Sequence, residues 1–242
     1  VDYLKETVRQ GSGLDKDRNL TPQAMERGLQ CLARFAERLA GFKPAQVRAV
    51  ATQTLREARN REEFLEQAQS VLGFPIEVIA GREEARLIYQ GVSRLLPQSA
   101  QKRLVVDIGG RSTELILGQG LDAQLTESYR LGCVAWSLRY FPDGAFTSKQ
   151  FHAAQIAAKA LLDDAAESFK AQGWDVAYGS SGTVGAIADI LAANGRGDHV
   201  VTIDGLEWLV DQFARAGHID RLRLAGLKDD RRAVIAGGVA TL

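Results

Sequence analysis

The fold of this chain is decided by residues 104–114, which read Leu-Val-Val-Asp-Ile-Gly-Gly-Arg-Ser-Thr-Glu. An apolar strand from Leu104 to Ile108 leads into a glycine turn, and a second strand, from Thr113 to Leu117, leaves it. The residues Gly118-Gln119-Gly120 then introduce a third strand, from Ala123 to about Leu131. Tight glycine turns between short strands predict an antiparallel meander.

The N-terminal half alternates strands with helices. Residues 3–9 have a strand-like pattern, and Thr21-Pro22 supplies a capping hydroxyl and a first-turn proline for a helix that ends at Gly41. The apolar runs 47–51 and 76–80 are interpreted as buried strands. This alternation predicts an α/β layer with parallel pairing.

We expect two lobes, with the boundary near Arg103. A helix over 81–96 and a short loop close the first lobe, residues 1–103, and the second lobe takes residues 104–242. Because no long flexible linker separates them, two lobes packed around a central cleft fit better than independent domains.

The composition excludes several classes of protein. Hydrophobic residues make up 45% and charged residues 25% of 242, which is typical of a globular domain. The 30 Lys and Arg balance the 30 Asp and Glu, so no overall basic field favours nucleic acid or a membrane surface. No apolar run has membrane-spanning length, and no signal peptide is visible. Cys31 and Cys133 lack metal or redox spacing, so we expect thiols in a reducing cytoplasm.

Two carboxylates flank the glycine turn. Asp107 ends the incoming strand and Glu114 begins the outgoing one, so both can point to one place. Gly109 and Gly110 let backbone N–H groups approach an anion, and Ser112 adds a hydroxyl. Two carboxylates beside phosphate donors suit Mg²⁺. An ordinary hairpin with solvated acids is the alternative, and a short glycine motif does not decide between them.

A second glycine segment reads Gly179-Ser180-Ser181-Gly182-Thr183. It follows a strand at 176–178 and precedes an apolar helix at 184–191. The N-terminus of a helix presents free N–H groups and the positive end of the helix dipole to an anion. No Lys follows the second glycine, which excludes the P-loop pattern. A capped helix start made of small residues explains this segment equally well.

Two charged residues stand at strand-to-helix junctions. Glu84 lies in the first turn after the strand 76–80, where a carboxylate can act as general base on water or merely complement the helix dipole. Arg56 follows the strand 47–51 and can clamp a phosphate or remain a solvated charge.

Taken in order, these pieces resemble the Ppx/GppA family of exopolyphosphatases and guanosine pentaphosphate phosphatases. The resemblance covers nearly the whole chain, and its pieces are specific together although each is weak alone. They are the helix 29–39, Ala51-Thr52 with Leu55-Arg56, and the segments 76–79, 83–89, 91–92, 107–114, 130–134 and 179–183.

The resemblance implies the two-lobed actin-like (ribonuclease H-like) fold and attack of water on a terminal phosphoryl group. Glu84 would be the base, Asp107 and Glu114 would hold Mg²⁺ or steer the water, and Arg56 would contact the reacting phosphoryl group. The two glycine segments would bind the phosphates through Gly109, Gly110, Arg111, Ser112, Gly179, Ser180, Ser181, Gly182 and Thr183.

The resemblance also sets expectations for substrate and partners. The substrate would be inorganic polyphosphate, guanosine pentaphosphate or both, in the cytoplasm, without nucleic acid or membrane, and a homodimer is compatible with the family. A kinase of the same fold and a non-catalytic sensor of polyphosphate or nucleotide are the alternatives. Arg111 stands where the family usually has a small residue. The family's first phosphate loop has no counterpart here, so we expect a fragment that is weakly active or inactive alone.

Overall fold

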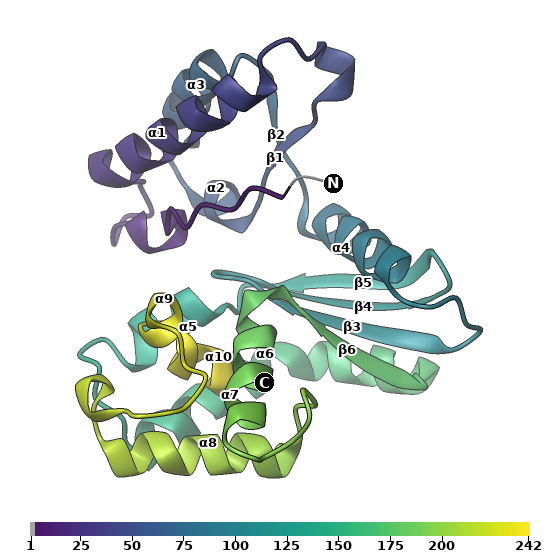
Figure 1. The fold of residues 1–242 in the computed structure, drawn as a ribbon, viewed down its shortest axis with the longest axis vertical. Coiled ribbons are helices and arrows are strands. Elements are labelled where there is room, and N and C mark those ends of the chain that lie inside the picture. The colour runs from purple at the N-terminus through teal and green to yellow at the C-terminus, as the bar shows by residue number, and fades with distance from the viewer. Residues whose placement is uncertain (1–2) are drawn as a thin grey trace. The chain divides into compact units, whose positions relative to one another are not determined.

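The computed structural model describes residues 3–242 of the chain (Figure 1). Its contacts divide into two compact units, residues 1–80 and 81–242. The division therefore falls earlier than the boundary that we expected near Arg103. The reason is helix α4 (Gly81–Leu95), which packs on strands β4 (Thr113–Gln119) and β5 (Asp122–Tyr129) and so belongs to the second unit.

The first unit packs helices beside a two-stranded sheet. Strands β1 (Ala49–Ala51) and β2 (Ile76–Val78) pair in parallel, as the sequence predicts. The predicted cap is also present, because Thr21 Oγ1 accepts a hydrogen bond from the amide of Ala24, 3.3 Å away. The other elements are η1 (Gln10–Gly13), α1 (Pro22–Leu39), η2 (Pro44–Gln46), α2 (Gln53–Glu57) and α3 (Arg61–Leu72).

Residues 3–9 do not form the strand that their pattern predicts. Arg9 adopts a φ of 55°, in the left-handed region, and η1 begins at the next residue. No strand within residues 3–242 pairs with this segment, so it has no ladder of hydrogen bonds to join.

The second unit is built on a four-stranded sheet. Its strands are β3 (Lys102–Ile108), β4, β5 and β6 (Val176–Ser180), in the order β5-β4-β3-β6. β3, β4 and β5 form the predicted antiparallel meander, and β6 pairs in parallel with β3.

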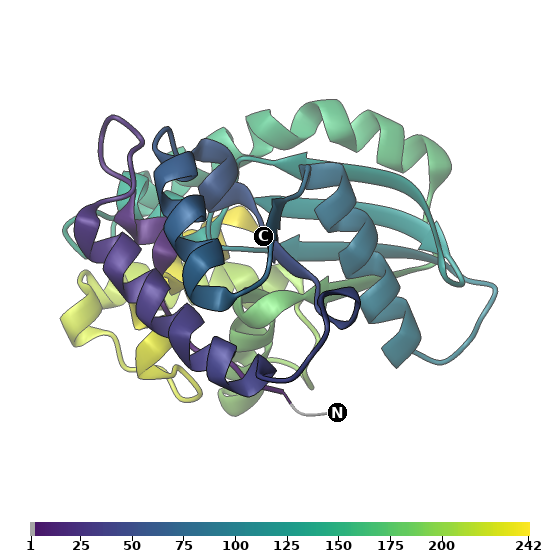
Figure 2. The same ribbon diagram turned by 90° about the horizontal axis from the view of Figure 1, so that it is seen from above.

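Helices cover both faces of this sheet (Figures 1 and 2). On one face, Ala85 and Tyr89 of α4 pack against Val105 and Ile116. On the other face, α6 (Ser148–Gln172) buries Phe169 against side chains of β3, β4 and β5. Since side chains alternate along a strand, the residues two positions from Val105 and Ile116 also face α4.

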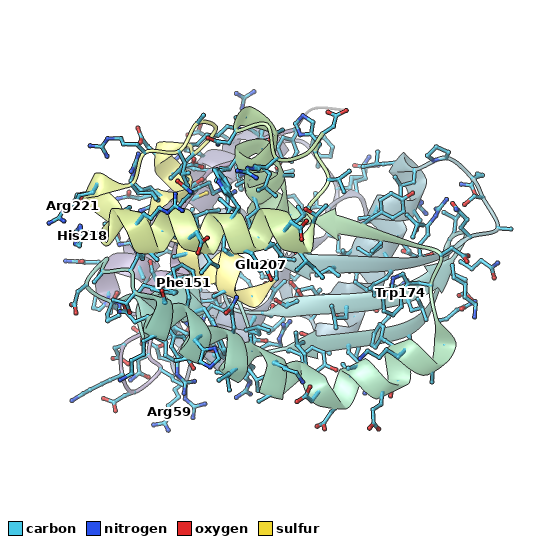
Figure 3. All side chains as sticks on the ribbon, turned by 90° about the horizontal axis from the view of Figure 1, so that it is seen from below. Arg59, Phe151, Trp174, Glu207, His218 and Arg221 are labelled. Carbon is cyan, nitrogen blue, oxygen red and sulfur yellow. The ribbon has the colours of Figure 1, made fainter. Side chains whose placement is uncertain are left out.

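A larger apolar core lies among the remaining helices. Phe141, Phe146, Phe151 and Phe213 stack there with ring centroids 4.7–6.3 Å apart, and Figure 3 labels Phe151. Both cysteines are free thiols, as expected, and no helix in residues 3–242 combines the length and apolarity of a membrane span. The helices not yet named are α5 (Cys133–Tyr140), α7 (Ser181–Ala193), α8 (Ile203–Ala216), η3 (Ile219–Arg221), α9 (Asp229–Arg232) and α10 (Ile235–Thr241).

Candidate active site

Four polar residues form one row across the sheet of the second unit. Ser128 of β5 lies opposite Glu114 of β4, Glu114 lies opposite Asp107 of β3, and Asp107 lies opposite Ser180 of β6. Residues paired in this way share a face of the sheet. Because Asp107 follows Val105 by two positions, that face is the one covered by α4. We call Ser128, Glu114, Asp107 and Ser180 the polar row.

The serines of the polar row hydrogen-bond to the carboxylates between them. Ser128 Oγ donates to Glu114 Oε1 at 2.8 Å. The Ser180 side chain hydrogen-bonds to the carboxylate of Asp107, and the hydroxyl of Ser112 adds a second partner for Glu114. Glu114 is 1% exposed, so these bonds replace the water that a surface carboxylate would have.

Both carboxyl groups of the polar row have pKa values above their ordinary range. Burial raises the pKa of Asp107, and the bond from Ser180 opposes the rise. Burial also raises the pKa of Glu114, to about 7; the negative charge of Glu84 is the second cause, and Asp107 adds a smaller contribution. Asp107 and Glu114 lie opposite each other, as the sequence analysis expects, and the charge of Glu84 reaches Glu114; the chemical roles of the three acids stay predictions.

The first turn of α4 carries two neighbouring glutamates, Glu83 and Glu84, whose partners differ. Glu83 is paired with Arg86, whose Nε and Nη2 both lie 2.7 Å from its carboxylate oxygens. Arg82 pairs with Glu127 of β5, with Nη2 2.8 Å from Oε1, and so ties the first turn of α4 to the sheet edge. Glu84 is left as the acid of this turn that acts on Glu114.

The glycine turn between β3 and β4 is closed by its own amide. Gly109 N–H donates to Ser112 O at 2.9 Å, so this amide serves the turn and is not offered to a phosphate. The phosphate role that we predicted for Gly109 through its N–H therefore needs correction. The carbonyls of Gly109 and Gly110 accept from Cys133 and Val134 at the start of α5, at 3.0 and 2.9 Å.

Gly132 allows this docking of α5 on the turn. A Cβ atom at that position would overlap the backbone of Gly110 and Arg111. Because the C=O and N–H of a trans peptide point in opposite directions, the amides of Gly110 and Arg111 face away from α5 and remain candidate phosphate contacts, and the phosphate contact of Ser112 stays a prediction.

The second glycine segment is not a loop. β6 continues through Gly179 to Ser180, and α7 begins directly at Ser181, whose φ is 80°. Ser181 Oγ donates to Ile108 O at 2.9 Å and accepts from Thr183 N at 3.2 Å. Ser181 therefore joins the end of β3 to the first turn of α7, and the two glycine segments, distant in sequence, lie together as predicted.

Arg231 lies beside this helix start and is not predicted as a site residue from the sequence. A Cβ atom at Gly182 would collide with the guanidinium of Arg231, so Arg231 of α9 lies against the first turn of α7. Its side chain is 22% exposed and lies 3.8 Å from Asp230. In the sequence Arg231 is one charge in the run Asp229-Asp230-Arg231-Arg232, and only the tertiary contact distinguishes it from its neighbours.

Arg56 belongs to the first unit and lies where both of its strands end. Its Nη1 donates to Ile79 O and its Nε to Gln53 Oε1, each at 2.9 Å. Ile79 follows β2 and Gln53 follows β1 closely, so Arg56 bridges the carboxyl ends of two parallel strands, the usual place for a ligand in an open α/β sheet. Its contact with a reacting phosphoryl group stays a prediction.

The acids of the row suit a metal only together with another ligand. Within the described part of the chain, no group of three or more His, Cys, Asp or Glu is arranged to hold a metal ion. Mg²⁺, however, commonly takes one or two carboxylates and completes its shell with water and substrate phosphates. Burial is the main cause of the raised pKa values of Asp107 and Glu114, and the charges of Glu84 and Asp107 add to it at Glu114; a bound cation would favour the charged form of both carboxyls. The donor set therefore fits Mg²⁺ bound with phosphate.

Known structures share the fold of this chain over almost its whole length. An exopolyphosphatase-like protein shares 28% identity with a TM-score of 0.82, covering 98% of this chain and 76% of its own. The Aquifex aeolicus PPX-GPPA enzyme shares 25% identity with a TM-score of 0.74, covering 98% and 79%. An exopolyphosphatase from Cytophaga hutchinsonii, at 22% identity and a TM-score of 0.78 over 95% and 77%, supports the fold.

The family relationship covers every residue of the sequence. The Ppx/GppA phosphatase family matches residues 1–242, which confirms the resemblance and, with it, the actin-like α/β fold. The polar row and the two glycine segments lie within that match. The chain belongs to the Ppx/GppA phosphatase family.

Proposed function

We propose that this protein hydrolyses the terminal phosphoanhydride bond of inorganic polyphosphate, of guanosine pentaphosphate, or of both. Membership of a phosphatase family and similarity to an exopolyphosphatase-like protein and a PPX-GPPA enzyme support this activity. The observation that carries the proposal is the gathering of Glu84, Asp107 and Glu114 beside the N-terminus of α7. Acids next to anion donors are the parts that phosphoryl transfer to water requires.

Glu84 is the proposed general base. It is half-buried in the first turn of α4, the helix that covers the face of the polar row, and its negative charge raises the pKa of Glu114. A carboxylate in this position takes a proton from water as the water attacks the terminal phosphorus. Asp107 and Glu114 hold Mg²⁺ in this proposal, and the bound ion would neutralise charge on the phosphates. The hydrogen bonds from Ser128 and Ser180 keep the two carboxylates oriented.

The phosphate chain is proposed to lie along the first turn of α7. The helix dipole and free amides favour an anion there. Arg231 brings a positive charge to the same turn at Gly182, which has no side chain to keep the guanidinium away. Arg111 adds a second cation at the glycine turn. Positioning and charge neutralisation are the main work of a protein in phosphoryl transfer, and these groups supply both.

One experiment separates this proposal from its alternatives. The full-length protein is incubated with Mg²⁺, ³²P-labelled polyphosphate and ADP, and the labelled products are resolved. We expect labelled orthophosphate. Label in ATP would instead indicate a kinase of the same fold, and retention of intact polyphosphate on the protein without turnover would indicate a sensor. Either of these two results would overturn the proposed hydrolase.

A further inference from the structure

The carboxylate plane of Glu114 is not fixed by the strand that carries it. The last side-chain torsion of glutamate joins an sp³ to an sp² carbon and has a broad, nearly two-fold preference. Packing of β4 places the carboxyl group in the polar row, but it leaves the plane of the two oxygens open. Hydrogen bonds from outside the residue therefore set that plane, and Glu114 has two such partners, Ser128 and Ser112.

Ser128 has the position to set it. Its Cα lies directly opposite that of Glu114 in the β4–β5 ladder, on the face covered by α4. Its hydroxyl donates to one of the two carboxylate oxygens of Glu114, Oε1, at 2.8 Å. Because the register fixes both backbones, the hydroxyl reaches the carboxylate without the entropy loss of ordering a long side chain.

The strand that carries Ser128 is also tied to the helix that carries Glu84. Arg82, in the first turn of α4, pairs with Glu127, the residue before Ser128. Glu127 lies opposite Leu115 and therefore points to the other face, so the Arg82 side chain reaches around the sheet edge formed by β5. Residues 127 and 128 thus connect the base-bearing turn of α4 to the acid of β4.

We propose that Ser128 is a positioning residue for the reaction, which acts by holding Glu114 Oε1 so that the second carboxylate oxygen faces the phosphate. This inference rests on the proposed function, since it assigns Ser128 a task in that same site. Ser128 itself touches neither the water nor the phosphate. Its loss removes no ionisable group from the row; it removes one hydrogen bond to Glu114, a bond that also lowers the pKa of that carboxyl.

The chain offers a matched control. Ser93 of α4 is fully buried in the same unit, and its hydroxyl has no hydrogen-bond partner within residues 3–242. Ser93→Ala and Ser128→Ala delete the same atom from the same residue type. Only the second substitution removes a bond to the polar row.

The test compares Ser128→Ala, Ser128→Thr, Ser128→Val and Ser93→Ala in the full-length protein. For each variant we would measure kcat and KM for polyphosphate, the melting temperature, and the shift of that temperature on titration with Mg²⁺ alone. Thr and Val have the same shape and differ in the hydroxyl, so this pair decides the question if Ser128→Ala fails to fold.

We expect Ser128→Ala and Ser128→Val to lower kcat by about tenfold or more with KM changed little, because a hydrogen bond to a charged group is lost while substrate contacts remain. Their Mg²⁺ titrations should shift to higher concentration. Ser128→Thr should retain both properties, and Ser93→Ala should match the wild type.

Two results would overturn the inference, and they are distinguishable. A wild type that releases phosphate, together with a Ser128→Val variant of equal kcat, would remove the positioning role and leave the proposed function standing. A wild type that releases no phosphate would remove the proposed function and this inference with it.

Discussion

Strand β3 carries a charged side chain near each end, fully buried Arg103 and half-buried Asp107, and the two have different partners. At the amino end, Arg103 is 1% exposed, and its Nη2 donates to Pro97 O and to Ser99 Oγ in the connection from α4. At the carboxyl end, Asp107 lies beside Glu114, and the charge of Glu84 is added to theirs. Both side chains belong to the face covered by α4, since they flank Val105 by two residues.

The difference separates a charge that serves the fold from one for which we propose a role in the reaction. Burying a charge costs free energy unless partners compensate it. Arg103 meets neutral oxygen acceptors supplied by the adjacent loop, and a cation near the C-terminus of α4 is favoured by the helix dipole. The acids of the polar row lie beside one another instead. Burial is the main cause of their raised pKa values, and for Glu114 the charges of Glu84 and Asp107 add to it. A bound cation would compensate this buried negative charge, as the proposed Mg²⁺ site requires.

The largest expected effect concerns the base. Glu84→Gln keeps the size of the side chain and removes its capacity to accept a proton. In the full-length protein kcat should fall by about 10²–10⁴-fold with polyphosphate binding largely intact. Steady-state kinetics with an equilibrium binding assay measure both quantities, and Glu83→Gln is the matched control because Glu83 is paired with Arg86. An unchanged kcat in Glu84→Gln would remove the assigned base.

The second effect is the pH dependence of stability. The folded-state pKa of Glu114 is raised from 4.5 to about 7, so between these values the folded protein holds a proton that the unfolded chain has released. The free energy of unfolding should therefore fall as the pH rises through this window, by about 3 kcal/mol for this group. Urea unfolding of the metal-free protein from pH 4.5 to 7.5 measures the slope. Glu114→Gln should flatten it, and an identical slope in this variant would contradict the assignment.

The third effect tests the other end of β3. Arg103→Met keeps an extended side chain but leaves Pro97 O and Ser99 Oγ without their donor, which should cost about 1–3 kcal/mol of stability. The kcat should not change, because Arg103 lies at the opposite end of the strand from the polar row. Denaturant unfolding and kinetics on the same preparation give both values. A loss of kcat without a loss of stability would contradict the purely structural role of Arg103.

The smallest effect is expected at the unusual arginine of the glycine turn. If Arg111 contacts phosphate, Arg111→Gly should raise KM by about tenfold at low salt, since a charge-assisted hydrogen bond is lost. The difference should shrink at high salt, where charges are screened. Equal kinetics in wild type and variant across salt concentrations would show that Arg111 is only a turn residue.

Much of the second unit's sheet follows from its sequence. The alternation around Asp107 and the glycines after it predict both the strands and the turn, because local backbone preference and the pairing partner lie close together in the chain. The carboxylate pair Asp107 and Glu114 follows from the same hairpin. The strand end at Gly179 is also marked locally, although the structure has no loop there.

The remaining features depend on contacts between distant segments. Residues 3–9 have a strand-like composition but no partner strand within residues 3–242. The unit boundary lies at residue 80 because α4 packs onto the sheet of the second unit. Arg231 reaches Gly182 across the fold, and the amide of Gly109 is used by Ser112. None of these contacts leaves a periodic or compositional signal in the sequence.

The most direct test of the account is the steady-state release of orthophosphate by the full-length protein from long-chain polyphosphate and from guanosine pentaphosphate, with Mg²⁺ and after its removal by chelation. The account predicts release of terminal phosphate from at least one substrate, lost on chelation and restored by Mg²⁺. No release from either substrate, by a folded protein with Mg²⁺ present, would contradict it.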